Sequence, residues 1–443
     1  MILLHPSIIV TMDKHMSILK NNYLGIDTET GLIEYISDKK PDYFDELIEL
    51  PNKIILPGFI NSHTHVAMTL LRGLKDDANL QEWLMQYILP VEKKLKPSYV
   101  YHGALYGVAE MLKHGITCFL DMYYHEIEVA KAVADAGIRA MLTYGSADIF
   151  FKRDPEEEFK IAEKFRKEIE DLIIERKAHD KIFFAYGPHS TYGCSKELLE
   201  LFRDASNERN MRIHIHLSET KDEVKMSKEK TGKTPVEYLA DLGMLSPKVM
   251  AAHVVWVNDK EISLLSKNGV HVLHNPSSNM KLASGVCPVD KMFKARVNVS
   301  LATDGPASNN RLDLWKEMYI ASLLQKCFEL DPVALNAKEA MRMATINGAR
   351  ALGLGNKIGS IEIGKFGDFI VVDMEKALES TPRHNIYSMI VYSLDSRYIE
   401  SVWIGGKKLY DAREGFYTID IENLRNKVED IRQKLLEEAG LAR

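Results

Sequence analysis

The middle of the chain alternates between two hydrophobic patterns. Short apolar runs rich in β-branched and aromatic residues are separated by segments whose apolar residues recur at helical spacing. The helical pattern is clear in residues 100–117, where Gly115 supplies the left-handed stop expected at a helix end. The predicted strands of this region are CFLDMY, RAMLTYG, KIFFAYGPH, MRIHIHLSE, KVMAAHVVWV, VHVLHNPS and VNVSLATDG.

Alternation of strands and helices at this pace indicates a parallel sheet. The stretch from His63 to Asp304 spans roughly 240 residues, close to the roughly 250 that eight βα units occupy. We therefore predict an α/β fold in which residues 57–356 form a (β/α)8 TIM-like barrel. We favour this barrel over an open, doubly wound sheet.

The two ends of the chain share a different pattern. Residues 1–56 and 357–420 both contain short β-rich runs divided by turn residues, such as IIVTMD near the start and FIVVDM near the end. Each set alone has too few strands for a stable sheet, so we predict one small composite β-sandwich formed from both chain ends. Residues 421–443 have helical apolar spacing with charged residues four positions apart, which predicts a surface helix.

Composition narrows the class of protein. At 443 residues, the chain is too long for one compact core and fits a large domain plus a smaller one. Its 46% hydrophobic and 27% charged residues are ordinary for a globular protein. The net charge of −6 argues against a nucleic-acid surface, which usually carries a basic face.

The cysteines and the first residues indicate the cellular compartment in which we expect the protein. The four cysteines are scattered and form no C-x-x-C pair, a pattern typical of reduced intracellular proteins. The opening MILLHPSIIVTMD has no basic leader, and its apolar run is too short for a signal peptide or a membrane span. We therefore expect a cytoplasmic protein that binds neither nucleic acid nor a membrane.

Polar residues gather at the C-terminal ends of the predicted strands. In a parallel barrel these ends open onto one face, so residues far apart in the sequence converge there. An isolated histidine at such an end is usually an ordinary polar residue, but here imidazoles and a carboxylate recur at several strand ends. This combination favours a site for a borderline cation such as Zn²⁺ or Fe²⁺. The residues concerned are His63, His65, His189, His216, Glu219, His253, His274, Asn275 and Asp304.

Several of these segments resemble the amidohydrolase superfamily. The matching segments are PGFINSHTH, HLSET, AAHVVW, HNPSSNMKLASG, ATDGPASNN and GKFGDFIVVD, in the order and roughly the spacing of that family. Two further segments, LLRGLKDDANLQEWLMQYILPVEKKL and YGPHSTYGCS, resemble the branch that deaminates 5′-substituted adenosines. The resemblance implies a metal-dependent aminohydrolase acting on 5′-methylthioadenosine, S-adenosylhomocysteine, 5′-deoxyadenosine or adenosine.

The resemblance also implies the metal ligands and their number. His214 and His216 are both possible ligands from spacing alone, but only His216 stands three residues before Glu219, as in the H-x-x-E motif of the family. We take His214 as a structural residue. Binuclear relatives place a lysine at the end of the fourth strand, whereas Lys181 begins that strand here, so we expect one divalent ion. Zinc is favoured, with iron or manganese as alternatives. The implied ligands are His63, His65, His216 and Asp304.

The expected mechanism follows from charge. A bound divalent ion supplies hydroxide at neutral pH, and attack on C6 of adenine places electron density on the ring. Glu219 is expected to protonate N1, and His253 to orient the nucleophile. Asp304 is expected to carry the water proton to the departing amine. Acid–base steps of this kind each contribute on the order of 10²–10⁴ in rate.

Four more residues are implied as substrate contacts. Trp83 is expected near the 5′ substituent, Glu92 at the ribose hydroxyls and His189 at the nucleoside. Without the resemblance, a packed indole and a surface carboxylate are the simpler interpretation of Trp83 and Glu92. Arg153 is expected at a homocysteine carboxylate. A second arginine of some family members corresponds to Tyr144 here, which favours methylthioadenosine or 5′-deoxyadenosine over S-adenosylhomocysteine.

Two rival functions stay open. The first is another reaction of the same superfamily, on a free base or a triazine such as guanine, cytosine or a chlorotriazine. The second is a non-catalytic barrel used for binding or assembly, but such descendants typically lose metal ligands, and every implied ligand is present here. The expected partner is a small-molecule nucleoside. A homo-oligomer is compatible with the family, although no motif indicates one.

Overall fold

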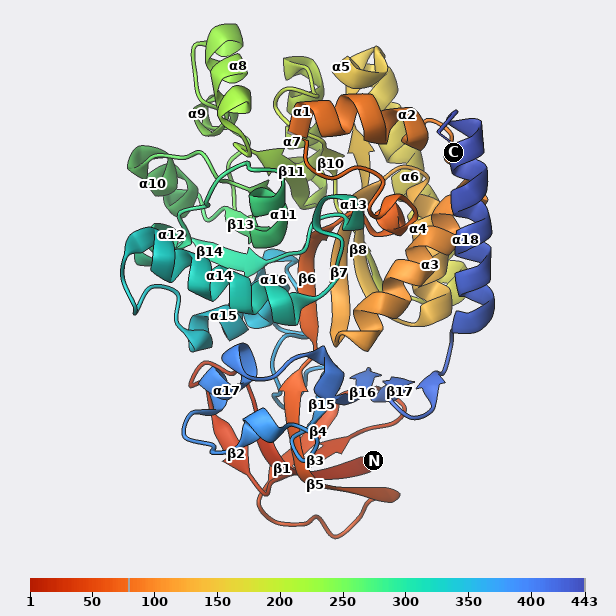
Figure 1. Ribbon diagram of the computed structural model, residues 1–443, viewed down its shortest axis with the longest axis vertical. Coiled ribbons are helices and arrows are strands. Elements are labelled where there is room, and N and C mark those ends of the chain that lie inside the picture. The colour runs from red at the N-terminus through yellow and green to blue at the C-terminus, as the bar shows by residue number, and fades with distance from the viewer. Residues whose placement is uncertain (79, 442–443) are drawn as a thin grey trace.

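The computed structural model describes residues 1–78 and 80–441 of the chain (Figure 1). A mixed sheet lies at one end of the molecule, and parallel strands surrounded by helices form the rest. The α/β class with parallel strands, predicted from the alternating pattern, is confirmed. No helix within the described ranges is long and apolar enough to cross a membrane.

Nine strands from both ends of the chain form the mixed sheet. Their order is β18-β17-β16-β15-β5-β1-β3-β4, with β2 paired to β1. The N-terminal and C-terminal strands meet where β5 pairs antiparallel with β15. Both chain ends thus contribute to one sheet, while their arrangement as a sandwich stays a prediction. The strands are β1 (Ile2–Val10), β2 (Ile18–Lys20), β3 (Tyr23–Ile26), β4 (Ile33–Ser37), β5 (Glu46–Pro57), β15 (Phe369–Asp373), β16 (Ile399–Ile404), β17 (Lys407–Asp411) and β18 (Gly415–Phe416).

Two parallel sheets make up the centre of the molecule. The first has the order β10-β8-β7-β6 with β9 also paired to β8, and the second has the order β11-β12-β13-β14. Parallel bridges from Tyr186 to Ile213 and from Ser190 to His216 connect the two sheets. The strands are β6 (Phe59–Thr64), β7 (Ile116–Tyr123), β8 (Arg139–Ser146), β9 (Ile182–Phe184), β10 (Gly187–Pro188), β11 (Ile213–Leu217), β12 (Val249–His253), β13 (His271–His274) and β14 (Asn298–Leu301).

Helical segments connect the parallel strands and cover their outer side (Figure 1). Those before β11 are η1 (Val66–Leu71), α1 (Leu80–Glu82), η2 (Trp83–Ile88), α2 (Leu89–Glu92), α3 (Pro97–Lys113), α4 (Glu126–Ala136), α5 (Asp148–Phe151), α6 (Pro155–Arg176) and α7 (Lys196–Arg209). Those between β11 and β15 are α8 (Lys221–Thr231), α9 (Pro235–Asp241), α10 (Asp259–Lys267), α11 (Pro276–Lys281), α12 (Val289–Lys294), α13 (Pro306–Asn309), α14 (Leu314–Glu329), α15 (Ala337–Ala344) and α16 (Ile346–Ala351).

The remaining helices lie near the C-terminus. They are η3 (Leu378–Ser380), α17 (Ile386–Tyr392), η4 (Ser396–Tyr398) and α18 (Ile421–Glu438). Helix α18 packs against α3 and buries Leu424, Ile431 and Leu435. It occupies most of the predicted C-terminal helix, of which residues 442 and 443 lie outside the described residues.

Two glycines fix the junction between the mixed sheet and the parallel strands. Strand β5 continues into β6 with only Gly58 between them, and a Cβ at Gly58 would lie 2.1 Å from the Oγ1 of Thr117. Gly115 follows α3 with a φ of 80°, the left-handed stop that the sequence predicts. Close packing therefore fixes where β6, the strand that carries His63, begins.

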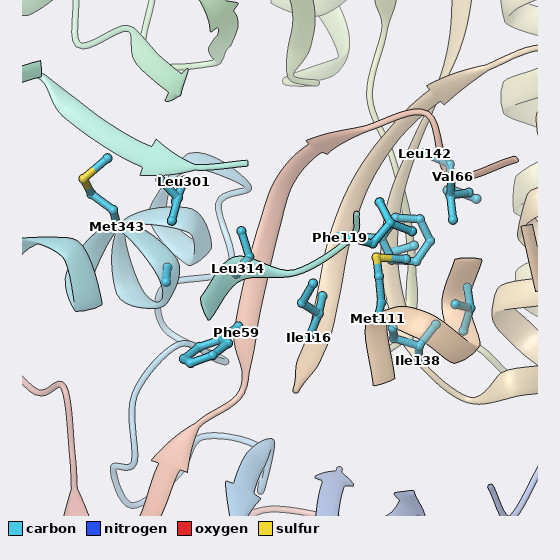
Figure 2. Packing of buried hydrophobic residues seen from close by; sticks show 14 of the residues in the cluster. Phe59, Val66, Met111, Ile116, Phe119, Ile138, Leu142, Leu301, Leu314 and Met343 are labelled. Carbon is cyan, nitrogen blue, oxygen red and sulfur yellow. The ribbon is translucent and has the colours of Figure 1, made fainter. Parts of the chain in front are cut away.

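A large apolar core lies between the parallel strands and their covering helices. Figure 2 shows Phe59 and Ile116 near the starts of β6 and β7, with Met111 of α3 and Leu314 of α14 also in this core. All four side chains are fully buried. Burial of such a side chain contributes roughly 1.5–3 kcal/mol, so the core holds these strands firmly in place.

Several predicted strands extend past the observed ones: VHVLHNPS forms β13 only as far as His274, and VNVSLATDG forms β14 only as far as Leu301. The run KVMAAHVVWV forms β12 only as far as His253, and the rest enters a loop. His253 and Val254 have φ values of 72° and 48°, so the backbone leaves the extended conformation there. A hydrophobic run does not report such a local turn. The run KIFFAYGPH is likewise divided, into β9 and β10.

Candidate active site

His63 and His65 lie at the end of β6. His63 is a fully buried strand residue, and His65 directly precedes η1. Asp304, which follows β14, is held beside them because its N–H donates to the carbonyl of His63 at 3.0 Å. The Oδ1 of Asp304 lies 3.4 Å from the Nε2 of His63 and 3.3 Å from the Nε2 of His65. Asp304, which is far from His63 and His65 in sequence, thus meets both of them at one point.

His216 and His253 complete this cluster from the second parallel sheet. One side-chain nitrogen from each of His63, His216 and His253 lies within 4.8 Å of the others. The same limit encloses His63, His65 and Asp304. His63 belongs to both groups and therefore stands at their centre. The structure brings all four sequence-predicted ligands together with His253.

These distances fit a tetrahedral metal site. Two ligand atoms that each lie about 2.0–2.1 Å from a tetrahedral ion are separated by about 3.4 Å. The distances from Asp304 Oδ1 to the Nε2 atoms of His63 and His65 are 3.4 and 3.3 Å. In addition, the buried Nε2 of His63 has no hydrogen-bond partner among the described residues. Nitrogen and carboxylate donors suit zinc, iron or manganese.

The other nitrogen of each ligand histidine is already occupied. The Nδ1 of His65 donates to the carbonyl of Met122 at 2.5 Å, and the Nδ1 of His216 donates to the carbonyl of His189 at 2.8 Å. Each proton is thereby fixed on Nδ1, and the lone pair of each Nε2 is left free. Partners of this kind orient metal ligands in many proteins.

His214 performs the same task for His63. The hydroxyl of Thr143 donates to the carbonyl of Asp121, so its oxygen accepts the Nδ1–H of His214 at 3.2 Å. The Nε2 of His214 then accepts the Nδ1–H of His63 at 2.8 Å. His63 consequently keeps its Nε2 lone pair towards the cluster. These two contacts agree with the prediction that His214 is a structural residue.

Burial keeps these imidazoles neutral. Burial lowers the pKa of His63 to about 4, a net shift to which the neighbouring His65 and His253 add and which Asp304 opposes. Burial likewise holds the pKa values of His214 and His216 well below the ordinary value. A neutral imidazole is the form that binds a metal ion.

Asp304 is held by hydroxyl groups on its other side. Ser278 and Ser308 both donate to its Oδ2, at 2.6 and 2.9 Å. The N–H of Gly305 donates to Oδ1 at 2.7 Å. Asp304 itself has a φ of 60°, and such strain in a non-glycine residue is common at functional sites.

Glu219 and His253 face each other beside the cluster. Their carboxylate oxygen and Nε2 are 3.8 Å apart. The Nδ1 of His253 contacts the Oδ1 of Asn279 at 2.8 Å, and the hydroxyl of Ser284 donates to Glu219 at 3.3 Å. Burial raises the pKa of Glu219, although His253 opposes the shift. Glu219 therefore gives up its proton less readily than an exposed glutamate does.

The whole-chain comparison decides the family. Residues 54–409 match the model of the amidohydrolase family. The chain belongs to the amidohydrolase family. The resemblance drawn from the motifs is confirmed, and with it the prediction of an enzyme.

Named relatives agree with this assignment. The chain is 49% identical over 404 residues to the 5-methylthioadenosine/S-adenosylhomocysteine deaminase of Thermococcus sibiricus, covering 88% of this chain and 93% of that protein. It is 42% identical over 410 residues to the 5′-deoxyadenosine deaminase of Methanosarcina barkeri, covering 93% of each. A crystal structure of an adenosine deaminase from Xanthomonas campestris with bound zinc superimposes with a TM-score of 0.91 at 33% identity, covering 98% of both chains.

A pocket of this amidohydrolase opens onto the cluster. Its lining includes Trp83, Glu92 and His189, all predicted as substrate contacts. The same lining includes the cluster residues His65, His216, Glu219, His253 and Asp304. Trp83 and Glu92 lie on the short helical segments α1, η2 and α2. These segments cross above the ends of the parallel strands (Figure 1). The pocket therefore has a polar floor, formed by the cluster, and is covered by the segment from α1 to α2.

Glu92 is buried rather than a surface carboxylate. It is 7% exposed, and its Oε1 accepts a hydrogen bond from the hydroxyl of Tyr123 at 2.7 Å. Burial raises the pKa of Glu92 to about 7, while Tyr123 opposes the shift. The simpler interpretation, a solvated surface residue, is therefore wrong for Glu92.

Arg153 lies apart from the other predicted residues. It lines a second cavity that adjoins the first through Glu92 and Tyr124. Its guanidinium pairs with the fully buried Glu158 at 2.8 Å and donates to the hydroxyl of Tyr144 at 3.4 Å. The charge of Arg153 is thus already balanced within the protein.

Sequence reasoning missed the residues that hold the site in this amidohydrolase. Ser278 and Asn279 lie in the HNPSSNMKLASG segment, and Ser308 lies in ATDGPASNN. Those segments are visible as family motifs, but the partner of each hydroxyl or amide depends on loop geometry. Tyr123 ends a predicted strand and carries no signal beyond its position. Only the structure pairs them with Asp304, His253 and Glu92.

Proposed function

We propose that this amidohydrolase catalyses the hydrolytic deamination of a 5′-substituted adenosine, giving the inosine analogue and ammonia. The observation that carries the proposal is the joint presence of the histidine–aspartate cluster and a buried glutamate, Glu219, at the floor of one pocket. Relatives named as deaminases of 5-methylthioadenosine, S-adenosylhomocysteine and 5′-deoxyadenosine support it. The candidate substrates are 5′-methylthioadenosine, S-adenosylhomocysteine, 5′-deoxyadenosine and adenosine.

We infer that His63, His65, His216 and Asp304 hold one divalent ion, with zinc first and iron or manganese as alternatives. The separations within the cluster and the zinc in the related adenosine deaminase structure support this assignment. When bound, the ion would supply hydroxide from water at neutral pH. No lysine lines the described part of the pocket, which supports a single ion.

The side chains around the cluster then divide the proton transfers. Asp304 accepts the proton of the attacking water while Ser278 and Ser308 hold its second oxygen. Glu219, whose pKa is raised by burial, donates a proton to N1 of the adenine ring as C6 is attacked. His253 orients the nucleophile through its Nε2. The proton on Asp304 passes to the exocyclic amine, the C6–N bond breaks and ammonia leaves. The hydroxyl proton released as the C6 carbonyl forms restores the proton that Glu219 gave to N1.

Further pocket residues select the nucleoside. Glu92 accepts hydrogen bonds from the ribose hydroxyls, His189 contacts the nucleoside, and Trp83 packs near the 5′ substituent. The lining also includes Leu80 and Leu84, and such apolar surroundings favour a small, uncharged 5′ group. Arg153 is the candidate contact of a homocysteine carboxylate, but its pairing with Glu158 favours methylthioadenosine or 5′-deoxyadenosine.

Deamination of a free base or hydrolysis of a triazine is the second candidate function. The same cluster could perform either reaction. Burial of Glu92 at the pocket wall favours the nucleoside, because a carboxylate there has ribose hydroxyls to accept hydrogen bonds from, and a free base offers none.

Ammonia release tests the proposal. Zinc-loaded protein is incubated with adenosine, 5′-methylthioadenosine, 5′-deoxyadenosine, S-adenosylhomocysteine, guanine and cytosine. The nucleosides are expected to release ammonia, and Glu219→Gln, which retains the metal ligands, is expected to lose activity by on the order of 10² or more. Release from guanine or cytosine alone would remove the nucleoside assignment. Release from none would favour the non-catalytic alternative.

We further propose the architecture predicted from the sequence. Residues 57–356 would form one closed (β/α)8 barrel, supported by the bridges from Ser190 to His216 and from Tyr186 to Ile213 and by the hydrogen bond from Asp304 to His63. Residues 1–56 and 357–420 would form the composite β-sandwich, and 421–443 the terminal helix. We also retain the predictions of a cytoplasmic location and of a possible homo-oligomer.

A further inference from the structure

Glu223 is a buried carboxylate that the mechanism does not use. It lies in the first turn of α8 and is 2% exposed. Its Oε1 accepts the N–H of Ser218 at 2.8 Å, and its Oε2 accepts the N–H of Glu219 at 2.7 Å. One side chain thus binds two consecutive backbone amides, the second of which belongs to the proposed general acid.

The peptide between Ser218 and Glu219 is held from its other side as well. The carbonyl of Ser218 accepts the N–H groups of Val255 at 3.0 Å and Trp256 at 2.9 Å. Ser218 has a φ of 51°, a left-handed conformation that is unfavourable for a non-glycine residue. A strained peptide at a functional site persists only when its surroundings fix it, and here Glu223 supplies both hydrogen bonds on the amide side.

Other helices of this chain show that the contact is not routine capping. Glu237, Glu261 and Glu339 occupy the third helical position, as Glu223 does, and each side chain accepts the N–H of the N-cap residue of its own helix. The N-cap residue of α8, Thr220, accepts the N–H of Glu223 in the usual way. The Glu223 carboxylate instead reaches past Thr220 to the two preceding amides.

We propose that Glu223 is a positioning residue for Glu219: by binding both amides, it fixes the backbone from which the Glu219 carboxylate faces His253 and the pocket. This inference rests on the proposed function. Glu223 acts through Glu219 and has no role at the metal ligands. Its loss should therefore lower the rate of the chemical step more than it weakens substrate or metal binding.

The test is a double-mutant cycle between Glu223→Gln and Glu219→Gln. Glutamine keeps the size of the side chain, but its NH₂ group faces one of the two N–H donors. We expect Glu223→Gln to lower kcat for 5′-methylthioadenosine by roughly 10–100-fold, with KM and zinc content changed less than about two-fold. In the Glu219→Gln background the same change should cost less than about two-fold, because the group being positioned is gone.

Glu261→Gln is the matched control. Glu261 is also 2% exposed and at the third helical position, but it accepts only the N–H of Asn258, at 2.8 Å. This variant makes the same change from carboxylate to amide, but its remaining oxygen can still accept the single N–H, so kcat is expected to stay within about two-fold. If Glu223→Gln does not fold, Glu223→Asp, which is too short to reach both amides, takes its place in the cycle.

The outcomes separate this inference from the proposed function. Equal losses of kcat from Glu223→Gln with and without Glu219 would overturn the positioning role, and so would a variant as active as the control. If Glu219→Gln alone retained full activity, the proposed function of Glu219 would fail instead, whatever Glu223 does.

Discussion

Replacing His214 by leucine removes the acceptor that fixes the proton of His63. The hydrogen bond from His63 Nδ1 to His214 Nε2 is 2.8 Å long, and both residues are fully buried. Without it, His63 must either bury an unpaired N–H, at a cost of about 1–3 kcal/mol, or move its proton to Nε2 and lose the lone pair that faces the cluster. Either response weakens the bound state of the metal relative to the free protein. We expect zinc affinity to fall roughly 10–100-fold.

Competition with a chromogenic chelator measures this change as a ratio of zinc dissociation constants. His214→Gln is the control, since its amide oxygen can accept the same N–H, and its affinity should stay within about three-fold of the unaltered protein. Melting temperatures of both apo variants check that the fold is retained. The reasoning is refuted if His214→Leu binds zinc as tightly as the unaltered protein, or if the glutamine variant is as weak as the leucine variant.

Three further predictions concern Glu92 and Arg139. Glu92→Ala should lower kcat/KM for 5′-methylthioadenosine by roughly 10–100-fold while leaving any guanine turnover within a few-fold. The reason is that hydrogen bonds to a charged group contribute about 1.5–3 kcal/mol. Equal losses of kcat/KM for the two substrates would contradict ribose recognition by Glu92. Burial raises the pKa of Glu92 from 4.5 to about 7, so the unaltered protein loses stability as pH rises from 4.5 through 7. The gain in unfolding free energy from Glu92→Gln, followed by thermal melting, should therefore grow between pH 5 and pH 8, up to about 3 kcal/mol. A gain that stays constant with pH would contradict this prediction. Arg139 is 1% exposed and pairs with Asp368 at 2.6 Å. Arg139→Met should lower the unfolding free energy by about 3–5 kcal/mol, because it leaves the buried Asp368 carboxylate unpaired. Denaturant unfolding curves that coincide for the two proteins would contradict this prediction.

The cluster of histidines and Asp304 could be predicted because its position follows from a simple geometric rule. His63, His216 and Asp304 stand at the ends of parallel strands, and such ends converge whatever the loops between them do. The choice between His214 and His216 needed the family motif, since spacing alone fits both. The structure gives the physical distinction, because both ring nitrogens of His214 are already hydrogen-bonded, one to Thr143 and the other to His63.

Residues on loops were less predictable. Arg153 lines an adjoining cavity and pairs with Glu158. The sequence could not predict this, because a loop follows no hydrophobic period that would orient its side chains. Glu223 and Glu261 occupy the same position in the first turns of their helices, yet one binds the amide of Glu219 and the other caps its own helix. That difference arises from the turn at Ser218, which tertiary contacts impose.

The zinc content of the purified, zinc-loaded and dialysed protein tests the central claim most directly. Inductively coupled plasma mass spectrometry should find one ion per chain in the unaltered protein and a large loss in a variant with His63 and His216 both replaced by alanine. Two ions per chain, or one ion that remains in the double variant, would contradict a single metal held by His63, His65, His216 and Asp304.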